Sequence, residues 1–257
     1  MKIGILTSSR ADYGIYLPLL QKLKIDSFFE LEIIAFGTHV SKKHGFTISD
    51  IVKDGYDKIH EINSLVDNDS KKGIATSYGN TVLSFSNFWA IHKFDLVFCL
   101  GDRFEMSAAV QASIPFGVKL AHIHGGETTL GAIDNIYRHQ ITLASQIHFV
   151  ASSIFYKKVS DITGDSKNIY NVGALSLDGL KKIDLPDWSD VRSLFDIPNK
   201  EFILITFHPE TINSDENKNY IEVIFETLNE LCKAHHLIIT LSNADTMGSL
   251  YRHSLEE

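Results

Sequence analysis

Short runs of β-branched and other apolar residues alternate along the chain with stretches whose apolar positions recur at helical spacing. This alternation is typical of parallel β–α units. The apolar runs in the first 180 residues predict strands at Ile3–Thr7, Leu31–Phe36, Lys58–Ile62, Leu96–Leu100, Val118–Ile123, Ile147–Ala151 and Ile169–Val172. The stretches between them predict helices at Tyr16–Leu23, Phe46–Lys53, Ile74–His92, Glu105–Ala112, Asp134–Ser145 and Ile154–Val159. Because several strands are apolar throughout, we expect an α/β domain with helices on both faces of its sheet.

The pattern changes after residue 180. Residues 181–200 contain two prolines and resemble a linker, and a new cycle of elements starts at residue 201. It predicts a strand over Phe202–Phe207, a helix near Asn219–Ala234 and a strand over Leu237–Leu241. Two strands are too few for an independent domain. We therefore expect residues 201–257 to be the incomplete beginning of a second domain.

Composition narrows the class of protein. Of the 257 residues, 44% are hydrophobic and 22% charged, as in ordinary globular proteins. The absence of a long apolar run argues against a membrane span, and the polar start of the chain argues against a signal peptide. Cys99 and Cys232 lie in apolar surroundings and are expected to be reduced core residues, which favours a cytoplasmic location. The net charge of −8, without a basic stripe, argues against nucleic acid as a partner.

The segment His122-Ile-His124-Gly-Gly-Glu127 follows an apolar strand. In an open α/β sheet, ligands bind at the carboxyl ends of the strands. The two glycines allow backbone N–H groups to approach an anion, and Glu127 would then lie beside it. The His-x-His pair invites a metal, but no Cys or Asp completes a familiar ligand spacing. We therefore predict no metal site there, with one of the two histidines a core residue.

Carboxylates and arginines follow in neighbouring segments. Asp134 and Arg138 are one helical turn apart, so that they can form a simple surface ion pair, but their position after the glycines favours a site. With Glu127 nearby, carboxylate pKa values would be pushed apart, which supplies both an acid and a base. Asp102 and Arg103 follow another strand and are candidates for an acid/base group and a phosphate contact; the alternative is a helix cap with a surface arginine.

The first βα turn, Ser8–Gly14, lacks the G-x-G-x-x-G fingerprint, which argues against a standard NAD enzyme. Arg10 stands just before a predicted helix, a position that suits a phosphate. The alternative is a solvated turn capped by Asp12. His208 and Asn243 follow the two strands of the second part and can contribute to a site from there.

Taken together, these motifs resemble the hydrolysing UDP-N-acetylglucosamine 2-epimerases of sialic acid biosynthesis. The resemblance rests on Thr7–Tyr13, Gly101–Arg103, His122–Glu127, Gly131–Asp134, Arg138-His139, His208-Pro209 and Ser242-Asn243. It implies two Rossmann-like domains in the glycosyltransferase-B arrangement, with the nucleotide sugar between them, and a homo-oligomer. The family continues beyond this sequence with further UDP contacts. We therefore expect the chain to be C-terminally truncated and to bind UDP weakly or not at all by itself.

The resemblance also implies a chemistry. The enzyme removes the proton from C2 of UDP-N-acetylglucosamine and expels UDP from C1, and water then adds to the glycal to give N-acetylmannosamine, without a cofactor or metal. Asp102, Glu127 and Asp134 match the acid/base carboxylates, and His208 matches a histidine near the leaving group. The substrate-binding residues implied are Arg10, Arg103, Arg138, Asn243 and His124.

Three other functions remain open at this point. Sister enzymes of legionaminic acid synthesis hydrolyse UDP-2,4-diacetamido-trideoxyhexose with the same motifs. A non-catalytic nucleotide-sugar-binding fragment is the second alternative. A glycosyltransferase is the third, and it is disfavoured because it has no need of so many carboxylates at the strand ends.

Overall fold

A computed structural model describes residues 1–178, 180, 184–208, 210, 212 and 216–240. The chain divides into two compact units, Met1–Asp178 and Gly179–Glu257, here called unit 1 and unit 2.

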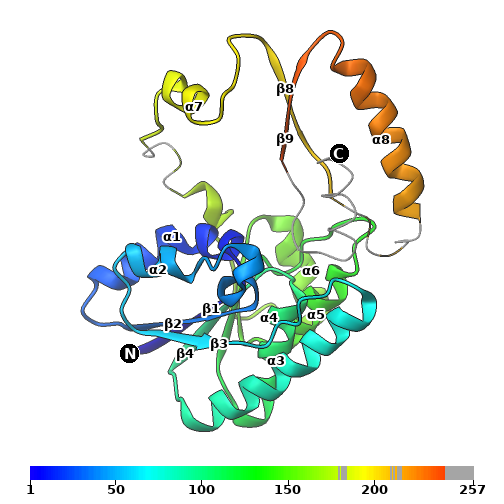
Figure 1. Ribbon diagram of the computed structural model, residues 1–257. Helices are drawn as coiled ribbons and strands as arrows, with labels where there is room; N and C mark the ends of the chain where they lie inside the picture. The colour runs from blue at the N-terminus through cyan, green and yellow to red at the C-terminus, as the bar shows by residue number, and fades with distance from the viewer. Residues whose placement is uncertain (179, 181–183, 209, 211, 213–215, 241–257) are drawn as a thin grey trace. The chain divides into compact units, whose positions relative to one another are not determined.

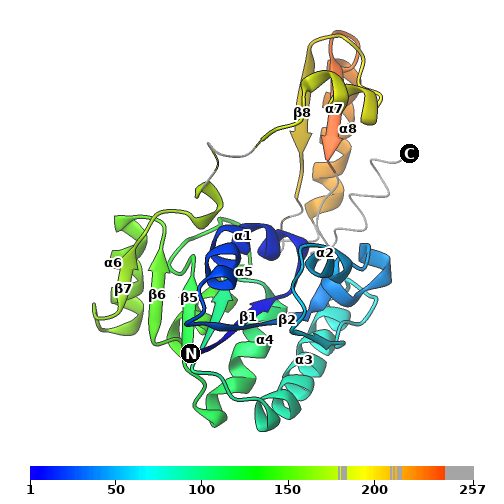
Figure 2. The same cartoon turned by 90° about the vertical axis from the view of Figure 1, so that its left-hand side faces the viewer.

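The described part of unit 1 contains a parallel seven-stranded sheet in the order β3-β2-β1-β4-β5-β6-β7 (Figures 1 and 2). The predicted α/β class and all seven predicted strands are confirmed. The strands are β1 Lys2–Thr7, β2 Glu30–Phe36, β3 Ile59–Ile62, β4 Leu96–Leu100, β5 Leu120–Ile123, β6 Ile147–Val150 and β7 Ile169–Asn171.

Helices connect consecutive strands, and the six predicted ones are present. They are α1 Arg10–Ile25, α2 Ile48–Lys53, α3 Lys71–Ile91, α4 Phe104–Ser113, α5 Asp134–Ala144 and α6 Ser153–Thr163. Short 3₁₀ turns lie at Gly37–Val40, Lys42–His44, Ile114–Phe116 and Leu175–Leu177.

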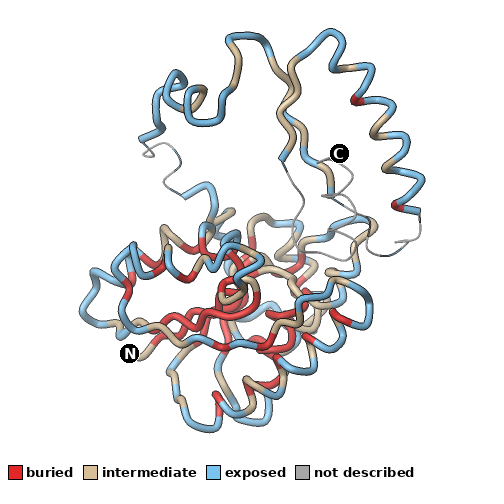
Figure 3. The backbone as a smooth tube through the Cα atoms, in the orientation of Figure 1, coloured by how far each residue is buried: buried red, intermediate tan, exposed pale blue. Residues whose placement is uncertain are grey.

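The sheet is buried on both faces because an apolar cluster lies on each side of it. Figure 3 shows buried residues concentrated along its strands. One cluster packs α1 and α2 against the sheet and includes Tyr16 and Leu20, both fully buried. The other packs α3, α4 and α5 and includes Phe85 and Trp89. Strands such as β1, buried from Ile3 to Thr7, therefore have apolar residues at consecutive positions rather than at alternate ones.

The strand order reverses between β1 and β4. After β1 the chain builds β2 and β3 on one side of it, and then crosses to place β4 on the other side. In open α/β sheets, ligands bind at such a switch point, outside the carboxyl ends of the strands. The segments that follow β1, β4 and β5 start at this edge.

The first of these segments starts α1. Ser9 caps the helix by accepting a hydrogen bond from the backbone N–H of Asp12 at 3.3 Å. The interpretation of Asp12 as the cap was wrong. Instead, the buried carboxylate of Asp12 accepts hydrogen bonds from Ser8, from its backbone N–H at 2.9 Å and its hydroxyl at 2.6 Å. Together these bonds fix the backbone turn from which Arg10 projects.

The described part of unit 2 contains β8 Phe202–Thr206 and β9 His236–Thr240, paired in parallel, with α7 Trp188–Leu194 and α8 Asn217–Leu231. Both predicted strands and the predicted long helix are present. Cys99 is buried in β4 as expected, but Cys232 is exposed, because it lies beyond the last turn of α8. None of the helices described here is long and apolar enough to cross a membrane.

Candidate active site

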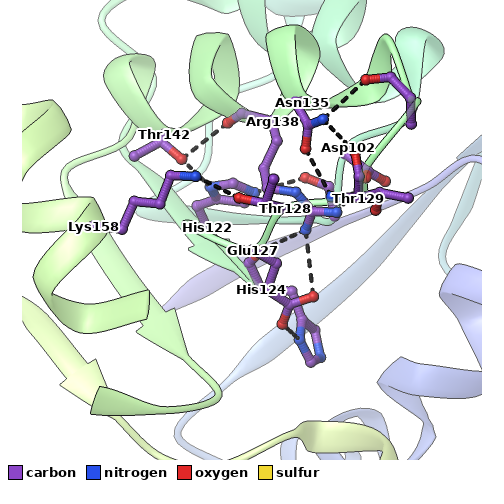
Figure 4. Close-up of polar contacts among 12 residues, drawn as sticks. Asp102, His122, His124, Glu127, Thr128, Thr129, Asn135, Arg138, Thr142 and Lys158 are labelled. Carbon is purple, nitrogen blue, oxygen red and sulfur yellow. Dashed lines mark hydrogen bonds and ion pairs between the residues drawn. The ribbon is translucent and has the colours of Figure 1, made fainter. Parts of the chain in front are cut away.

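The segments that follow β4 and β5 bring four predicted site residues together with the first half of α5. Asp102 follows β4, and His124 and Glu127 follow β5. Arg138 comes from the second turn of α5, and its side chain contacts all three of the others, as Figure 4 shows. We call Asp102, His124, Glu127 and Arg138 the Arg138 cluster.

Arg138 is 5% exposed and holds this cluster together. Its Nη2 donates a hydrogen bond to Asp102 Oδ2. Its Nη1 donates to the backbone carbonyl of His124 at 2.7 Å and lies 3.6 Å from Glu127 Oε2. The guanidinium therefore bridges two carboxylates from different strand ends, using the fork geometry in which arginine differs from lysine.

Asp102 is a carboxylate whose surroundings oppose ionisation. Burial raises its pKa above the usual value, and the positive charges of Arg138 and Arg103 offset only part of that effect. A carboxylate with a raised pKa is a stronger base, and its protonated form is available at higher pH. About a quarter of the side chain, 24%, remains exposed, so a ligand can reach it.

His124 and Glu127 form a pair. Nδ1 of His124 lies 2.6 Å from Glu127 Oε1, while its Nε2 is buried and has no hydrogen-bond partner among the described residues. The backbone of His124 has φ of 65°, which is uncommon for a residue other than glycine. Residues in such conformations are found most often at functional sites. This conformation turns the chain sharply after β5 and places the imidazole against Glu127.

His122 is the core histidine of the His-x-His pair. It is fully buried, its Nε2 donates to the carbonyl of Gly101 at 2.9 Å, and its Nδ1 faces Thr142 Oγ1 at 3.1 Å. Burial lowers its pKa to about 3, so the ring is neutral. Since both ring nitrogens are engaged inside the protein, His122 fixes the segment before Asp102 rather than facing a ligand.

Gly126 has to be glycine because the loop passes close to α6. Its φ is +79°, and a Cβ built there would lie 2.7 Å from the carbonyl oxygen of Phe155. That close approach positions Glu127, the next residue.

The loop between Glu127 and α5 is tied to the helix by Asn135. Its side chain accepts from the backbone N–H of Thr129 at 2.9 Å and donates to the carbonyls of Thr129 at 2.6 Å and Ala132 at 2.9 Å. Lys158 donates a hydrogen bond to Thr128 Oγ1 from α6. These bonds fix the loop that ends at Asp134, the first residue of α5.

Arg103 lies next to Asp102 and is oriented by a carboxylate that the sequence analysis did not single out. Its Nη2 donates to Glu105 Oε1 at 2.9 Å, and Glu105 is 1% exposed. Burial raises the pKa of Glu105 above its usual value, and Arg103 opposes that shift. An acidic residue two positions after an arginine, in the first turn of a helix, was the available signal.

The other predicted residues lie as follows. Arg10 is exposed in the first turn of α1, at the carboxyl end of β1. Asp134 starts α5 and is partly buried; the described ion pairs of Arg138 are with Asp102 and Glu127, not with Asp134. His208 is exposed and follows β8 in unit 2. Asn243 lies outside the described residues.

Comparison with known proteins gives related sequences over the whole chain. The family described as UDP-N-acetylglucosamine 2-epimerase matches residues 21–257. The GDP/UDP-N,N'-diacetylbacillosamine 2-epimerase (hydrolyzing) of Campylobacter jejuni is 32% identical over 256 residues, covering 99% of this chain and 66% of the relative. The polysialic acid biosynthesis protein P7 of Escherichia coli is 28% identical over 255 residues, covering 99% and 65%. The chain thus spans about two thirds of the length of these relatives.

A solved structure has the same fold. The UDP-GlcNAc 2-epimerase from Neisseria meningitidis, bound to UDP-GlcNAc, matches with a TM-score of 0.77 and 17% identity, covering 100% of this chain and 70% of that one. At this identity the similarity supports the fold and not the role of any residue.

Proposed function

The chain belongs to the UDP-N-acetylglucosamine 2-epimerase family, and on that premise we propose that it carries the acid/base half of a hydrolysing 2-epimerase. The reaction converts UDP-N-acetylglucosamine and water to N-acetylmannosamine and UDP, which supplies a precursor for sialic acid. The observation that carries the proposal is the Arg138 cluster, in which two carboxylates and a histidine meet around one buried arginine.

The reaction needs proton transfers and no redox step. In the elimination, a base takes the proton from C2, the C1–O bond breaks and its electron pair leaves with UDP. In the hydration, the hydroxyl of water adds to C1 and a proton adds to the opposite face of C2, which inverts that centre. The site must therefore supply a base for a weakly acidic C–H bond, positive charge for the leaving diphosphate and a base for water.

The Arg138 cluster supplies the proton-transfer groups. Asp102 is suited to accept a proton because burial raises its pKa. Glu127 is also suited to a proton transfer, because Nδ1 of His124 lies 2.6 Å from its Oε1 and fixes the carboxylate. Asp134 completes the set of acid/base carboxylates, and we leave the order of the individual transfers unassigned. Arg138 positions Asp102 and Glu127 and lowers the cost of having both ionised.

We propose that basic groups around the Arg138 cluster bind the diphosphate of the UDP-sugar. Arg10 at the start of α1 and Arg103 before α4 stand at helix N-termini, where an anion is favoured. His208 and Asn243 are proposed as contacts from unit 2, His208 near the leaving group.

A second substrate is favoured by one comparison. The relative at 32% identity is named for N,N'-diacetylbacillosamine, which carries acetamido groups at C2 and C4. The same elimination and hydration apply to it, because only C1 and C2 react. UDP-2,4-diacetamido-trideoxyhexose is therefore the alternative substrate.

The test is incubation of the intact gene product with each UDP-sugar in D₂O, followed by NMR. The proposal predicts free UDP and a free 2-epimerised sugar carrying deuterium at C2, with the C1 oxygen derived from water. Simple hydrolysis would give unlabelled sugar with the original configuration, and a non-hydrolysing epimerase would give a UDP-linked product. Either result contradicts the proposal, and the preferred sugar identifies the substrate. Asp102→Asn, which keeps the shape of the side chain, is the matched control.

A further inference from the structure

A second polar cluster lies at the opposite, amino end of the sheet in unit 1. Glu32 is the third residue of β2, His60 is the second residue of β3, and His92 follows the last residue of α3. One carboxylate oxygen and one ring nitrogen from each histidine all lie within 4.8 Å of one another. The Arg138 cluster follows the carboxyl ends of β4 and β5, so the two groups are separate.

The packing around this cluster fixes the two imidazoles. Nε2 of His60 lies 2.7 Å from Glu32 Oε2, and Glu32 is 8% exposed. The rings of His60 and His92 have centroids 4.5 Å apart. The buried ring of Phe88 stacks on His92 at 4.4 Å and meets His60 edge-on at 5.1 Å. An aromatic wall therefore holds both histidines beside a buried carboxylate.

The groups that contact the carboxylate of Glu32 favour its negatively charged form, which is the form that binds a cation. Lys2 Nζ lies 2.9 Å from Glu32 Oε1, and the same ammonium lies over the ring of Phe94 at 4.8 Å from its centroid. Burial of Glu32 opposes ionisation, but hydrogen bonds from His60 and Lys2 outweigh it and hold the pKa of Glu32 below its usual value. Burial lowers the pKa of His92 below its usual value. The carbonyl end of α3 adds a negative partial charge.

We propose that Glu32, His60 and His92 form a Zn²⁺ site, and that the ammonium of Lys2 competes with the ion for Glu32. Two imidazoles and a carboxylate form a donor set that Zn²⁺ accepts, with a fourth position left for water. Bonds of about 2.1 Å in a tetrahedron place ligand atoms about 3.4 Å apart. Nε2 of His60 and Oε2 of Glu32, at 2.7 Å, would have to separate slightly, whereas ligand atoms at the widest separation, up to 4.8 Å, would have to close by about an ångström or slightly more. When the ion binds, Lys2 keeps its contact with the ring of Phe94.

The bound ion would join β2, β3 and the end of α3 without entering the reaction. It therefore raises the stability of unit 1 by mass action, since the three ligands come together only in the folded chain. The sequence analysis considered a metal only at His122 and His124 and predicted none. It did not consider Glu32, His60 and His92, which stand 28 and 32 positions apart and have no recognisable spacing.

The experiment is calorimetric titration of the tag-free protein with Zn²⁺, with Co²⁺ absorption as a probe of tetrahedral coordination. A Cys232→Ser background removes the exposed thiol, which would otherwise bind these ions. We expect one site whose affinity falls at least about tenfold in His92→Gln and in Glu32→Gln, since loss of a ligand costs no less than loss of its supporting partner. The matched control is His235→Gln, which alters an exposed histidine of unit 2 and should change nothing.

The variant Lys2→Gln tests the proposal more sharply than the ligand variants do, because it should increase binding. Removal of the competing ammonium should raise the Zn²⁺ affinity and increase the Zn²⁺-dependent rise in melting temperature. Adventitious binding to surface histidines would be the same in Lys2→Gln and in the parent. The site is wrong if no Zn²⁺ binds, or if the affinity is unchanged in both ligand variants. If those variants fail to fold, an unchanged affinity in Lys2→Gln refutes the proposal instead.

Discussion

Replacing Arg138 by glutamine removes the cation that joins Asp102 and Glu127 while keeping a polar side chain of similar reach. The variant leaves Asp102 without its Nη2 donor and leaves the carbonyl of His124 without the hydrogen bond at 2.7 Å. It also leaves the carboxylates of Asp102 and Glu127 without the positive charge that lies between them. We expect unit 1 to lose stability and the loop after β5 to loosen.

The size of the loss follows from burial. Breaking a fully buried ion pair by removing one partner costs about 3–5 kcal/mol. Arg138 has 6% of its side chain exposed, but Asp102 and Glu127 keep 24% and 28% exposed, so water compensates part of the loss. We expect the free energy of unfolding to fall by about 2–3 kcal/mol near neutral pH.

The pH dependence has a definite sign. Burial raises the pKa of Asp102 in the folded state, so its contribution to stability is present in acid and is lost as the pH rises through that pKa. Arg138 offsets part of the loss by favouring the ionised form. Without Arg138 the pKa rises further, and the folded variant takes up its proton at a higher pH. The destabilisation should therefore be largest near neutral pH and shrink as the pH falls toward the pKa of Asp102.

Urea unfolding followed by tryptophan fluorescence measures this in unit 1 alone. The chain has two tryptophans, and Trp188→Phe leaves only Trp89, which is fully buried in unit 1. In that background Arg138→Gln is compared with Arg10→Gln, an exposed arginine whose loss should change stability by less than about 0.5 kcal/mol. The reasoning is refuted if the two variants match near pH 7, or if the effect of Arg138→Gln grows as the pH is lowered.

Two further predictions follow from the site and its loops. In the intact gene product, Asp102→Asn, Glu127→Gln and Asp134→Asn should each lower kcat by at least about a hundredfold, as measured by UDP release, because each removes a positioned acid/base group; near-normal kcat in a folded variant would remove that residue from the catalytic set. Gly126→Ala should destabilise unit 1 by more than about 1 kcal/mol, because its Cβ meets Phe155 O at 2.7 Å and its φ is positive, whereas Gly14→Ala in α1, with nothing within 4 Å, should stabilise it by about 0.5–1 kcal/mol. Melting temperatures of that pair check the second prediction, and equal shifts would contradict it.

The order of elements and the location of the Arg138 cluster could be predicted from the sequence. Apolar runs ended at Leu100 and Ile123, and the polar residues after each run were expected at the same edge of one sheet. That argument depends only on strand direction, which the alternation with helices determines.

The partner of Arg138 could not be predicted in the same way. Helical spacing suggested Asp134, four positions earlier, because such pairs face each other on one helix. The described ion pairs of Arg138 are instead with Asp102 and Glu127, because α5 lies over the ends of β4 and β5, a placement that depends on tertiary packing. Glu105 and Asn135 were missed for the same reason. The ion pair of Glu105 with Arg103 and the hydrogen bonds of Asn135 to its loop depend on tertiary packing and produce no periodic pattern in the sequence.

The two cysteines differ in a way that is useful for experiment. Cys99 is fully buried, and burial raises the pKa of its thiol to about 12, so it does not react with maleimides. Cys232 is exposed in unit 2 and is the other cysteine of the sequence. A fluorophore can therefore be attached to the unaltered chain at one defined position. With Trp89 as donor in the Trp188→Phe background, energy transfer to that dye would report on the separation of the two units as a nucleotide sugar is added.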